Sequence, residues 1–592
     1  MAIIMSCSAA YAFPLMIRCS AESQSRRPPR IGLPKPSTST NYYSSSASAS
    51  ASASACASAA YHKISSTVDS LPRTIKETWV KLLDDFVDGV FEFVDQPYLP
   101  SQSNFAPVDE IGEPVYATVV HGSIPHDFPE GVYIRNGPNP LFGGLKSTKS
   151  IFGKSSHSWI EGEGMLHALY FSKDSDGRWM ISYNNRHVET DTFKHEKDRK
   201  KPGFLPAIEG DSPAVLLAYL LNWLRFGSVN KYLSNTSVFE HSGKFYSAAE
   251  NHIPQEIDIL TLETRWNWDI NGDWTRPFTS HPKKAPGTGE LVIMGIYPQK
   301  PYFELGIVSA DGKKLLHKVD LKLSRCCLCH EIGVTGRLIK YNKKGYARIG
   351  IMPRYGDAYS VHWFEVEPSC TFHIINCYEE DDEVIVLACR AHNSIIPGPD
   401  FGWNKFEWFS KGFKQIGALE EIDEESEDES FLSRVYEWRL NMRTGDVAEK
   451  NLTGAEYSID FPIINEKCIG KKNKFGYTQV VDSDASSISG MAKYGGLAKI
   501  YLEERELDEL IKVEYHKFPG NTFCSGAAFV AKSGGVEEDD GWIITYVHNE
   551  DSDVSQVYIV DAKNFSHEPV AKITLPRRVP YGFHGAFMPL HP

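Results

Sequence analysis

The chain has 592 residues, 42% of them hydrophobic, and a formal net charge of -14. This acidic balance argues against a nucleic-acid partner, whose phosphates require a basic face. No apolar run reaches the length of about 18 residues that indicates a transmembrane helix. The eleven cysteines have no regular spacing, which fits reduced thiols better than a disulfide framework.

The first sixty residues differ in composition from the rest of the chain. They contain the run SSSASASASASACASAA and several Arg and Lys residues, and Glu22 is the only acidic residue before Asp69. A basic, acid-poor leader rich in Ser and Ala is typical of an organelle transit peptide. The alternatives are a low-complexity tail without an address and, because the opening MAIIMSCSAAYAFPLMI is apolar, a secretory signal. We expect residues 1–60 to lie outside the fold.

The next segment, residues 61–104, is predicted to be helical between Pro72 and Pro97. Its apolar residues recur three or four positions apart and form one stripe. The polar face is acidic, which is unfavourable next to anionic lipid. We therefore expect this helix to dock on the main domain, with a membrane surface as the alternative. The stripe consists of Ile75, Trp79, Leu82, Leu83, Phe86, Val90 and Phe93.

From about residue 113 onwards the pattern becomes that of β-strands. Short runs rich in Val, Ile, Tyr and Phe alternate with turn clusters such as SADGKK and NEDSD. Many short strands at turn spacing indicate a sandwich, a barrel or a propeller. The remaining length, roughly 480 residues, is too great for one sandwich and suits a propeller with insertions. The predicted strands include GRLIKYN, ARIGIM, DEVIVLACR, GWIITYV and QVYIVDA.

Two insertions interrupt the strand pattern. Residues 213–227, PAVLLAYLLNWLRFG, are apolar almost all round and too few to span a bilayer. They predict either a buried helix or an apolar lip at a membrane. Residues 420–430, EEIDEESEDES, form a run of like charge that is typical of a solvated loop.

Four of the twenty histidines lie in strand-like or glycine-rich surroundings: His281 in TSHPKK, His330 in LCHEIGVT, His373 in CTFHIINCYEE and His584 in YGFHGAF. They lack the HxxxH spacing that would indicate a local metal site. In a propeller, however, distant inner strands converge on one axis, and imidazole is a good ligand for iron, zinc and copper. Spacing alone does not separate such a centre from four unrelated packed histidines.

A group of cysteines precedes His330. Adjacent strand residues point to opposite faces, and no second cysteine pair completes a tetrahedral zinc site. Buried thiols are therefore favoured over zinc ligands for Cys326, Cys327 and Cys329.

Seven stretches in order give the chain a resemblance to a known family: VYIRNGPNPLF, WIEGEGMLHAL, TSHPKKAPGTGE, CHEIGVTG, FHIINCYEE, YSIDFPIIN and YGFHGAFMP. Together they resemble the plant-type carotenoid cleavage dioxygenases, over roughly residues 105–592. The resemblance implies an all-β, seven-bladed propeller with a helical dome over an axial non-haem Fe(II). It also implies the metal ligands, which would be His281, His330, His373 and His584.

The resemblance further implies an activity. Members of this family use O2 to cleave one conjugated C=C bond of a carotenoid or apocarotenoid, giving two carbonyl products. The sequence is most similar in character to the 9,10-cleaving enzymes and to a zaxinone-synthase-like branch that cleaves at the 13,14 position. With the leader, this implies a plastid enzyme. The acidic balance argues against a nucleic-acid partner, and no obligate protein partner is inferred. Contact with a membrane or plastoglobule stays open.

Family members also orient three of the iron ligands with carboxylates. The matching positions are Glu250, expected behind His330, and Asp460, expected behind His373 and one methylene shorter than the usual glutamate. The third position, behind His584, is Gly526, which departs from the pattern. This departure supports one alternative function, a carotenoid-binding protein with weak or lost catalysis. An oxygenase that cleaves stilbenes is a second alternative, because such enzymes share the architecture that the resemblance implies.

Overall fold

The computed structural model describes residues 2–5, 73–297, 299–323, 330–334, 347–391, 410, 412–413, 432–454, 456–503 and 510–590. The predicted strand GRLIKYN, the acidic run at 420–430 and Cys326, Cys327 and Cys329 all lie outside these residues. None of the helices in the described part is long and apolar enough to span a membrane.

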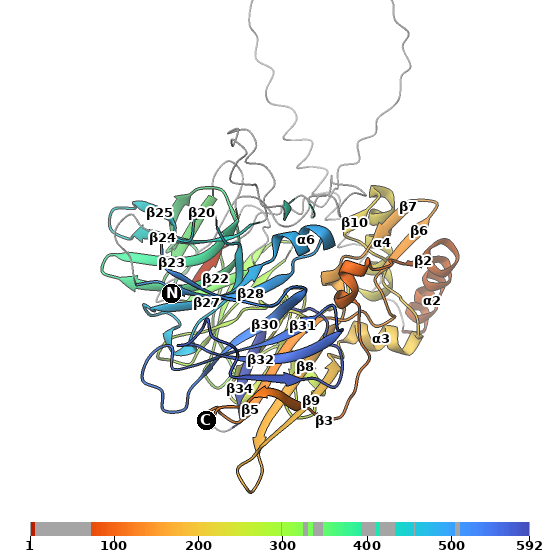
Figure 1. Ribbon diagram of the computed structural model, residues 1–592. Helices are drawn as coiled ribbons and strands as arrows, with labels where there is room; N and C mark the ends of the chain where they lie inside the picture. Colours follow the sequence, from red (N-terminus) through yellow and green to blue (C-terminus); the bar gives the residue numbers. More distant parts are fainter. Residues whose placement is uncertain are drawn as a thin grey trace, which may run out of the picture.

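The described strands form antiparallel blades, and the predicted all-β propeller is confirmed (Figure 1). Seven blades can be distinguished, of which the sixth and seventh are joined in one nine-stranded sheet. The second and third blades are built from consecutive strands. The second contains β11 (Ser237–His241), β12 (Lys244–Ala248), β13 (Gln255–Ile257) and β14 (Thr264–Asn267). The third contains β15 (Lys283–Lys284), β16 (Leu291–Ile296), β17 (Phe303–Val308) and β18 (Leu315–Asp320).

The fourth blade includes a strand from the beginning of the chain. It contains β19 (Glu331–Val334), β1 (Ala2–Met5), β20 (Ala347–Met352) and β21 (His362–Val366), with β1 paired between β19 and β20. The expectation that residues 1–60 lie outside the fold therefore differs from the structure at Ala2–Met5. An extended apolar segment satisfies the backbone groups of two open strand edges, which accounts for the pairing.

The fifth and sixth blades again follow the chain order. The fifth contains β22 (Cys370–Glu380), β23 (Glu383–Ala391), β24 (Arg434–Asn441) and β25 (Val447–Asn451). The sixth contains β26 (Ile459–Ile463), β27 (Phe475–Val481), β28 (Tyr494–Tyr501) and β29 (Val513–Lys517). The expected strands ARIGIM and DEVIVLACR correspond to β20 and β23.

Both ends of the propeller domain close the ring. In the first blade, the C-terminal strand β34 (Gly585–Pro589) pairs with β5 (Gly131–Pro138), followed by β8 (Gly164–Lys173), β9 (Trp179–His187) and β3 (Val115–Tyr116). The seventh blade contains β30 (Thr522–Ala531), β31 (Gly541–Asn549), β32 (Val554–Asp561) and β33 (Ala571–Thr574), and β4 (Thr118–Gly122) pairs with β33. The first and seventh blades meet at what we call the seam, and each of them therefore holds strands from both ends of this domain.

The blades pack through their two apolar faces. In β5, Val132 and Ile134 point to one face and pack with Val238 of the second blade. Tyr133, between them, points to the other face and packs with Tyr546 of the seventh blade. Since successive strand residues alternate between faces, a strand buried on both sides reads as a continuous apolar run, as VYI does here.

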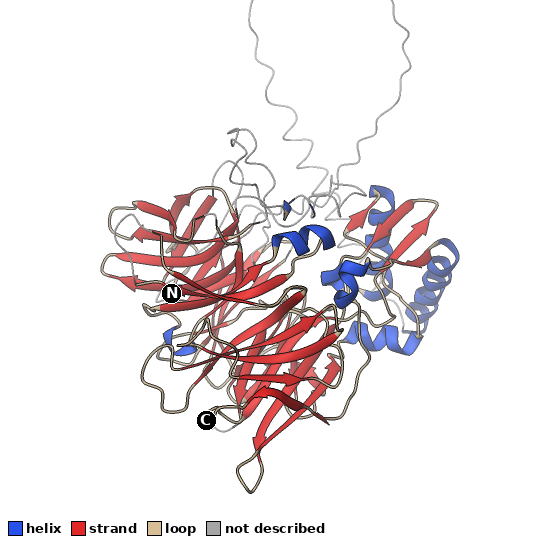
Figure 2. Ribbon diagram, in the orientation of Figure 1, coloured by secondary structure: helices blue, strands red, loops and turns tan. Residues whose placement is uncertain are grey.

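Helices and one small sheet gather on one side of the blades (Figure 2). The helices are α2 (Arg73–Val90), α3 (Asp191–Arg199), α4 (Ser212–Phe226) and α6 (Ser483–Ser489), with 3-10 turns η1 (Pro100–Phe105) and η2 (Trp159–Glu161). A further 3-10 turn, η4 (Glu466–Cys468), lies apart from this group. The small sheet contains β10 (Glu209–Gly210), β7 (Gly153–Ser156), β6 (Lys146–Ser150) and β2 (Glu92–Asp95). These elements are the helical part that the resemblance implies.

The first helix differs from its prediction in length and in the side that it buries. It ends at Val90, and Phe93 lies in β2, because residues 92–95 pair with β6. Of the predicted stripe, Leu83 and Val90 pack against α4, together with Val87. The other half of the stripe is exposed, so docking accounts for only part of it: Ile75, Trp79, Leu82 and Phe86.

Residues 213–227 do form a helix, α4, but it is not buried all round. Ala218 and Leu221 face the interior, whereas Leu216 and Leu220 are exposed by 41% and 45%. The cysteines also depart in part from the expectation of reduced thiols. Cys370 is disulfide-bonded, while the free thiols in the described part are Cys377, Cys389, Cys468 and Cys524.

Candidate metal centre

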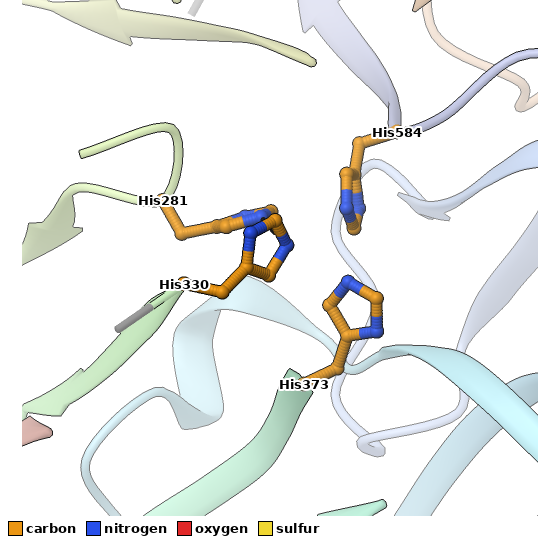
Figure 3. A group of neighbouring side chains, drawn as sticks. All are labelled: His281, His330, His373 and His584. Carbon is orange, nitrogen blue, oxygen red and sulfur yellow. Dashed lines mark hydrogen bonds between the residues drawn. The ribbon is translucent and has the colours of Figure 1, made fainter. Parts of the chain in front are cut away.

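The four predicted histidines lie together on the axis of the propeller. His281 lies in the loop before β15, His330 directly precedes β19, His373 lies in β22, and His584 directly precedes β34. Each of these strands is the edge strand of its sheet. One ligand atom from each histidine lies within 4.8 Å of those of the other three, and the four rings are turned toward one another (Figure 3).

The rings approach closely enough to share one ion. The Nε2 atoms of His281 and His330 are 3.0 Å apart. The ring centroids of His281 and His584 are 4.4 Å apart, and those of His373 and His584 are 4.9 Å apart. A set of nitrogen donors that converge without an intervening residue is the arrangement that a first-row transition metal requires.

Carboxylates hold two of the four imidazoles from behind. Glu250, which follows β12, lies 2.8 Å from His330 Nδ1 through its Oε1 and also accepts a hydrogen bond from Ser280. Asp460 Oδ1, in β26, lies 2.7 Å from His373 Nδ1. Such contacts fix the tautomer and the ring orientation of a metal-binding histidine, leaving Nε2 to face the metal. The shorter Asp460 side chain therefore reaches its histidine.

The other two imidazoles have no such support. Within the described residues, neither His281 nor His584 is paired with a carboxylate. Gly526, the third position that the resemblance indicates, has a φ of +72°, and a Cβ added there would lie 2.4 Å from Cγ of Arg135. Arg135 is 1% exposed, so this space is filled. The packing of Arg135 therefore leaves no space for a carboxylate side chain at position 526.

The pKa values of two of the four imidazoles favour the neutral form that binds metals. Burial, together with the neighbouring imidazoles, lowers the pKa of His281 and of His584 well below the usual range. Burial opposes protonation of His330 as well, but the facing Glu250 raises its pKa above the usual value. Burial acts against the charge of Glu250 too, yet contact with His330 holds the Glu250 pKa below its usual value. Neutral imidazoles are the ligating form.

One buried atom indicates directly that the centre requires a further group. His373 Nε2 is buried and has no hydrogen-bond partner in the described part of the chain, while its Nδ1 contacts Asp460. A buried polar atom without a partner is costly. A metal ion held by the four histidines would give this atom a partner. The residues present therefore fit a metal ion.

Sequence reasoning missed Phe461, which lies in the same centre. Its ring centroid is 4.7 Å from that of His373 and 4.8 Å from that of His584. The available signal was Pro462, because a proline inside a strand pattern often marks a bulge that re-aims its neighbours. Phe372, beside His373 in the sequence, packs in a similar way on His330, at 5.2 Å.

Comparison with known proteins identifies relatives over most of the chain. A family model described as retinal pigment epithelial membrane protein matches residues 105–339 and 336–589. The carotenoid 9,10(9',10')-cleavage dioxygenase 1 of Arabidopsis thaliana is 31% identical over 564 residues, covering 88% of this chain and 96% of the relative. The chloroplastic 9-cis-epoxycarotenoid dioxygenase NCED1 of Oryza sativa subsp. japonica is 28% identical over 562 residues, covering 88% of this chain and 80% of the relative.

Solved structures share the fold. The cobalt-substituted apocarotenoid oxygenase of Synechocystis matches with a TM-score of 0.64 at 18% identity, covering 83% of this chain and 99% of the other. The lignostilbene dioxygenase of Pseudomonas brassicacearum also matches with a TM-score of 0.64, at 20% identity, covering 83% of this chain and 100% of the other. At these identities the likeness concerns the fold alone.

Proposed function

This chain belongs to the carotenoid oxygenase family, and we propose that it is a non-haem Fe(II) dioxygenase acting on a carotenoid or apocarotenoid. It cleaves one conjugated C=C bond and gives two carbonyl products. The observation that carries this proposal is the convergence of His281, His330, His373 and His584 within 4.8 Å on the propeller axis.

The atoms of the reaction balance without a further cofactor. One atom of O2 enters each of the two carbonyl groups, so no external reductant is required. Ferrous iron, held by the four histidines, would supply the Lewis acidity and redox chemistry that activate O2. The protein supplies orientation and excludes competing reactions.

The residues of the chain have separable roles in this proposal. Glu250 and Asp460 accept hydrogen bonds from the outer nitrogens of His330 and His373, so both imidazoles present Nε2 to the ion. Four neutral ligands would leave the charge of the ion uncompensated by its direct ligands. Phe372 and Phe461 supply apolar surface beside the ligands, which suits an apolar polyene.

The scissile bond is the finer part of the proposal. The Arabidopsis relative is named for cleavage at 9,10(9',10'), which supports that position, and the sequence resemblance keeps the 13,14 position beside it. A stilbene substrate is less well supported, because the lignostilbene dioxygenase shares only the fold. A plastid location is part of the proposal, supported by the composition of residues 1–60 and by the chloroplastic relative.

The decisive experiment identifies the products. The full chain, which retains β1, is purified without oxygen, loaded with Fe(II) and supplied with 18O2 and a panel of C40 carotenoids, apocarotenoids and stilbenes. We expect two carbonyl products, each with one labelled oxygen, and their lengths give the scissile bond. Cleavage of stilbenes alone would change the substrate class. Iron and carotenoid binding without oxygen uptake would leave a binding protein.

A peripheral membrane contact is a further part of the proposal. Exposed apolar residues of α2 and α4 lie on helices that pack together, including Trp79, Phe86, Leu216 and Leu220. Replacing Leu216 and Leu220 by Glu should lower partition into liposomes without changing iron content. Leu221 is unsuited to this test, because it is buried. Leu260→Glu, at another exposed leucine, is the matched control, and equal partition of both variants would contradict the contact.

A further inference from the structure

Phe461 has an unusual backbone conformation. Its φ is +51°, in the left-handed region that bulky side chains rarely adopt. Such a conformation is unfavourable and persists only where the surroundings impose it, which is most often at functional sites. Pro462 follows directly and does not donate a backbone hydrogen bond. The strain therefore lies at the point where β26 passes the metal centre.

A bulge explains how two consecutive residues reach the same centre. In a regular strand, neighbouring side chains point to opposite faces. Here the pairing of β26 with β27 shifts register between Asp460 and Ile463. Bulges of this kind re-aim side chains next to active sites. As a result, Asp460 contacts His373 Nδ1, and the ring of Phe461 also lies against the His373 imidazole.

Asp460 stabilises the bulge from within. Its Oδ1 accepts a hydrogen bond from the backbone N–H of Phe461 at 2.8 Å, in addition to contacting His373. A longer carboxylate side chain would set this oxygen farther from its own backbone. The shorter residue at position 460 and the strained residue at 461 thus form one local unit.

The second contact of the Phe461 ring is with His584. Their centroids are 4.8 Å apart and the planes are inclined by 42°, within the range of favourable aromatic pairs. The backbone of His584 is held, because its N–H donates to Thr236 and its carbonyl accepts from Asn136. Those bonds do not fix rotation of the imidazole. The carboxylate position at Gly526 has no room for a side chain.

We infer that Phe461 is a positioning residue of the metal centre, whose ring holds the imidazole of His584 in its ligating orientation. It performs by packing what Glu250 and Asp460 perform by hydrogen bonding. This inference rests on the metal centre of the proposed function, and it assigns to the chain a way of completing that centre without a third carboxylate.

The test measures metal affinity and does not depend on turnover. Anaerobic titration of the full chain with Fe(II), and with Co(II) followed by its visible spectrum, gives the dissociation constant for each variant. Phe461→Leu keeps apolar volume but removes the flat ring, and we expect about tenfold weaker binding with an altered Co(II) spectrum. Phe372→Leu is the matched control. It removes a ring beside His330, which Glu250 already holds, and should weaken metal binding by less than about threefold.

A double-mutant cycle identifies the histidine through which Phe461 acts. In a His584→Ala background, Phe461→Leu should cause no further loss of affinity, because the ring then has no ligand to orient. An undiminished loss in that background would assign the effect to His373 and overturn the inference. Phe461→Gly, which suits the positive φ, repeats the measurement should the leucine variant fold poorly.

The outcomes separate this inference from the proposed function. If the unmodified chain binds neither Fe(II) nor Co(II), the metal centre itself fails. If it binds both and Phe461→Leu binds equally well, the centre stands and the role of Phe461 is overturned.

Discussion

Two halves of the metal centre hold their histidines by different means. His330 and His373 each contact a carboxylate at 2.7–2.8 Å, supplied by Glu250 after β12 and by Asp460 in β26. His584 lies at the seam where the C-terminal strand closes the ring, and its neighbours there are glycines, Arg135 and aromatic rings. The first half is oriented by directional hydrogen bonds, and the second by close packing.

The difference shows what close packing requires of the sequence. At the seam, the backbones of β34 and β30 approach so closely that Gly585 has no room for a side chain. Arg135 fills the space beside Gly526 and Gly582, and donates to Ser525 and to the carbonyl of Pro580. Glycine allows this approach because it lacks Cβ. The seam is therefore predicted to be more sensitive to added volume than to lost hydrogen bonds.

The largest expected effect comes from Gly585→Ala. The added Cβ would lie 1.8 Å from the backbone oxygen of Gly526, so β34 must move. We expect a loss of more than about 3 kcal/mol in the free energy of unfolding, measured by denaturant titration. Gly520→Ala is the control, since a Cβ there meets nothing within 4 Å. Equal stability of the two variants would refute close packing at the seam.

Gly526→Glu follows, and it tests whether a carboxylate can be restored behind His584. The new side chain would start at a φ of +72° and 2.4 Å from Cγ of Arg135. We expect a loss of about 2–3 kcal/mol in stability and no gain in metal affinity. Tighter binding of Fe(II) by this variant would show that the seam accepts the hydrogen-bonded arrangement of the other half.

The carboxylate half should respond to isosteric changes that leave packing intact. Glu250→Gln and Asp460→Asn each remove the charge that orients an imidazole, and each should weaken metal binding by about 10–100-fold. Asp460→Asn should have the larger effect on the seam as well, because Asp460 also holds the backbone of Phe461. Anaerobic titration with Fe(II) gives the dissociation constant of each variant. Ser525→Ala, which removes a seam hydrogen bond to Arg135, is the control and should change metal affinity little.

The same contrast marks the limits of prediction from sequence. The strands, the propeller and the four histidines could be predicted, because alternating patterns and seven family-like stretches carry them. Asp460 lies in one of the same stretches, and Glu250 was predicted as a position that the family resemblance implies. Two features could not be predicted: the positive φ of Phe461, and the way Arg135 occupies the space beside Gly526. Both depend on contacts between blades that are far apart in sequence. The end of α2 at Val90 likewise depends on the pairing of β2 with β6.

The effect that is smallest at neutral pH concerns acid sensitivity near the seam. His548, in β31, lies beside Tyr581, with ring centroids 6.2 Å apart, and burial lowers the pKa of His548 to about 4. The unfolded chain takes up a proton at this residue near pH 6.5, whereas the folded chain does not. Its contribution to stability is therefore intact above about pH 6.5 and declines as the pH falls toward about 4.

The slope that His548 adds is at most about 1.4 kcal/mol per pH unit. His548→Gln should remove this part of the pH dependence between about pH 6.5 and 4, measured by denaturant titration at each pH. His317→Gln is the comparison, at a half-buried histidine of the third blade that contacts a backbone carbonyl and a tyrosine ring. Both variants could retain the full pH dependence of the free energy of unfolding that the unmodified chain shows in acid. In that case the pH dependence does not arise from His548, and the buried neutral histidine near the seam does not destabilise the fold in acid.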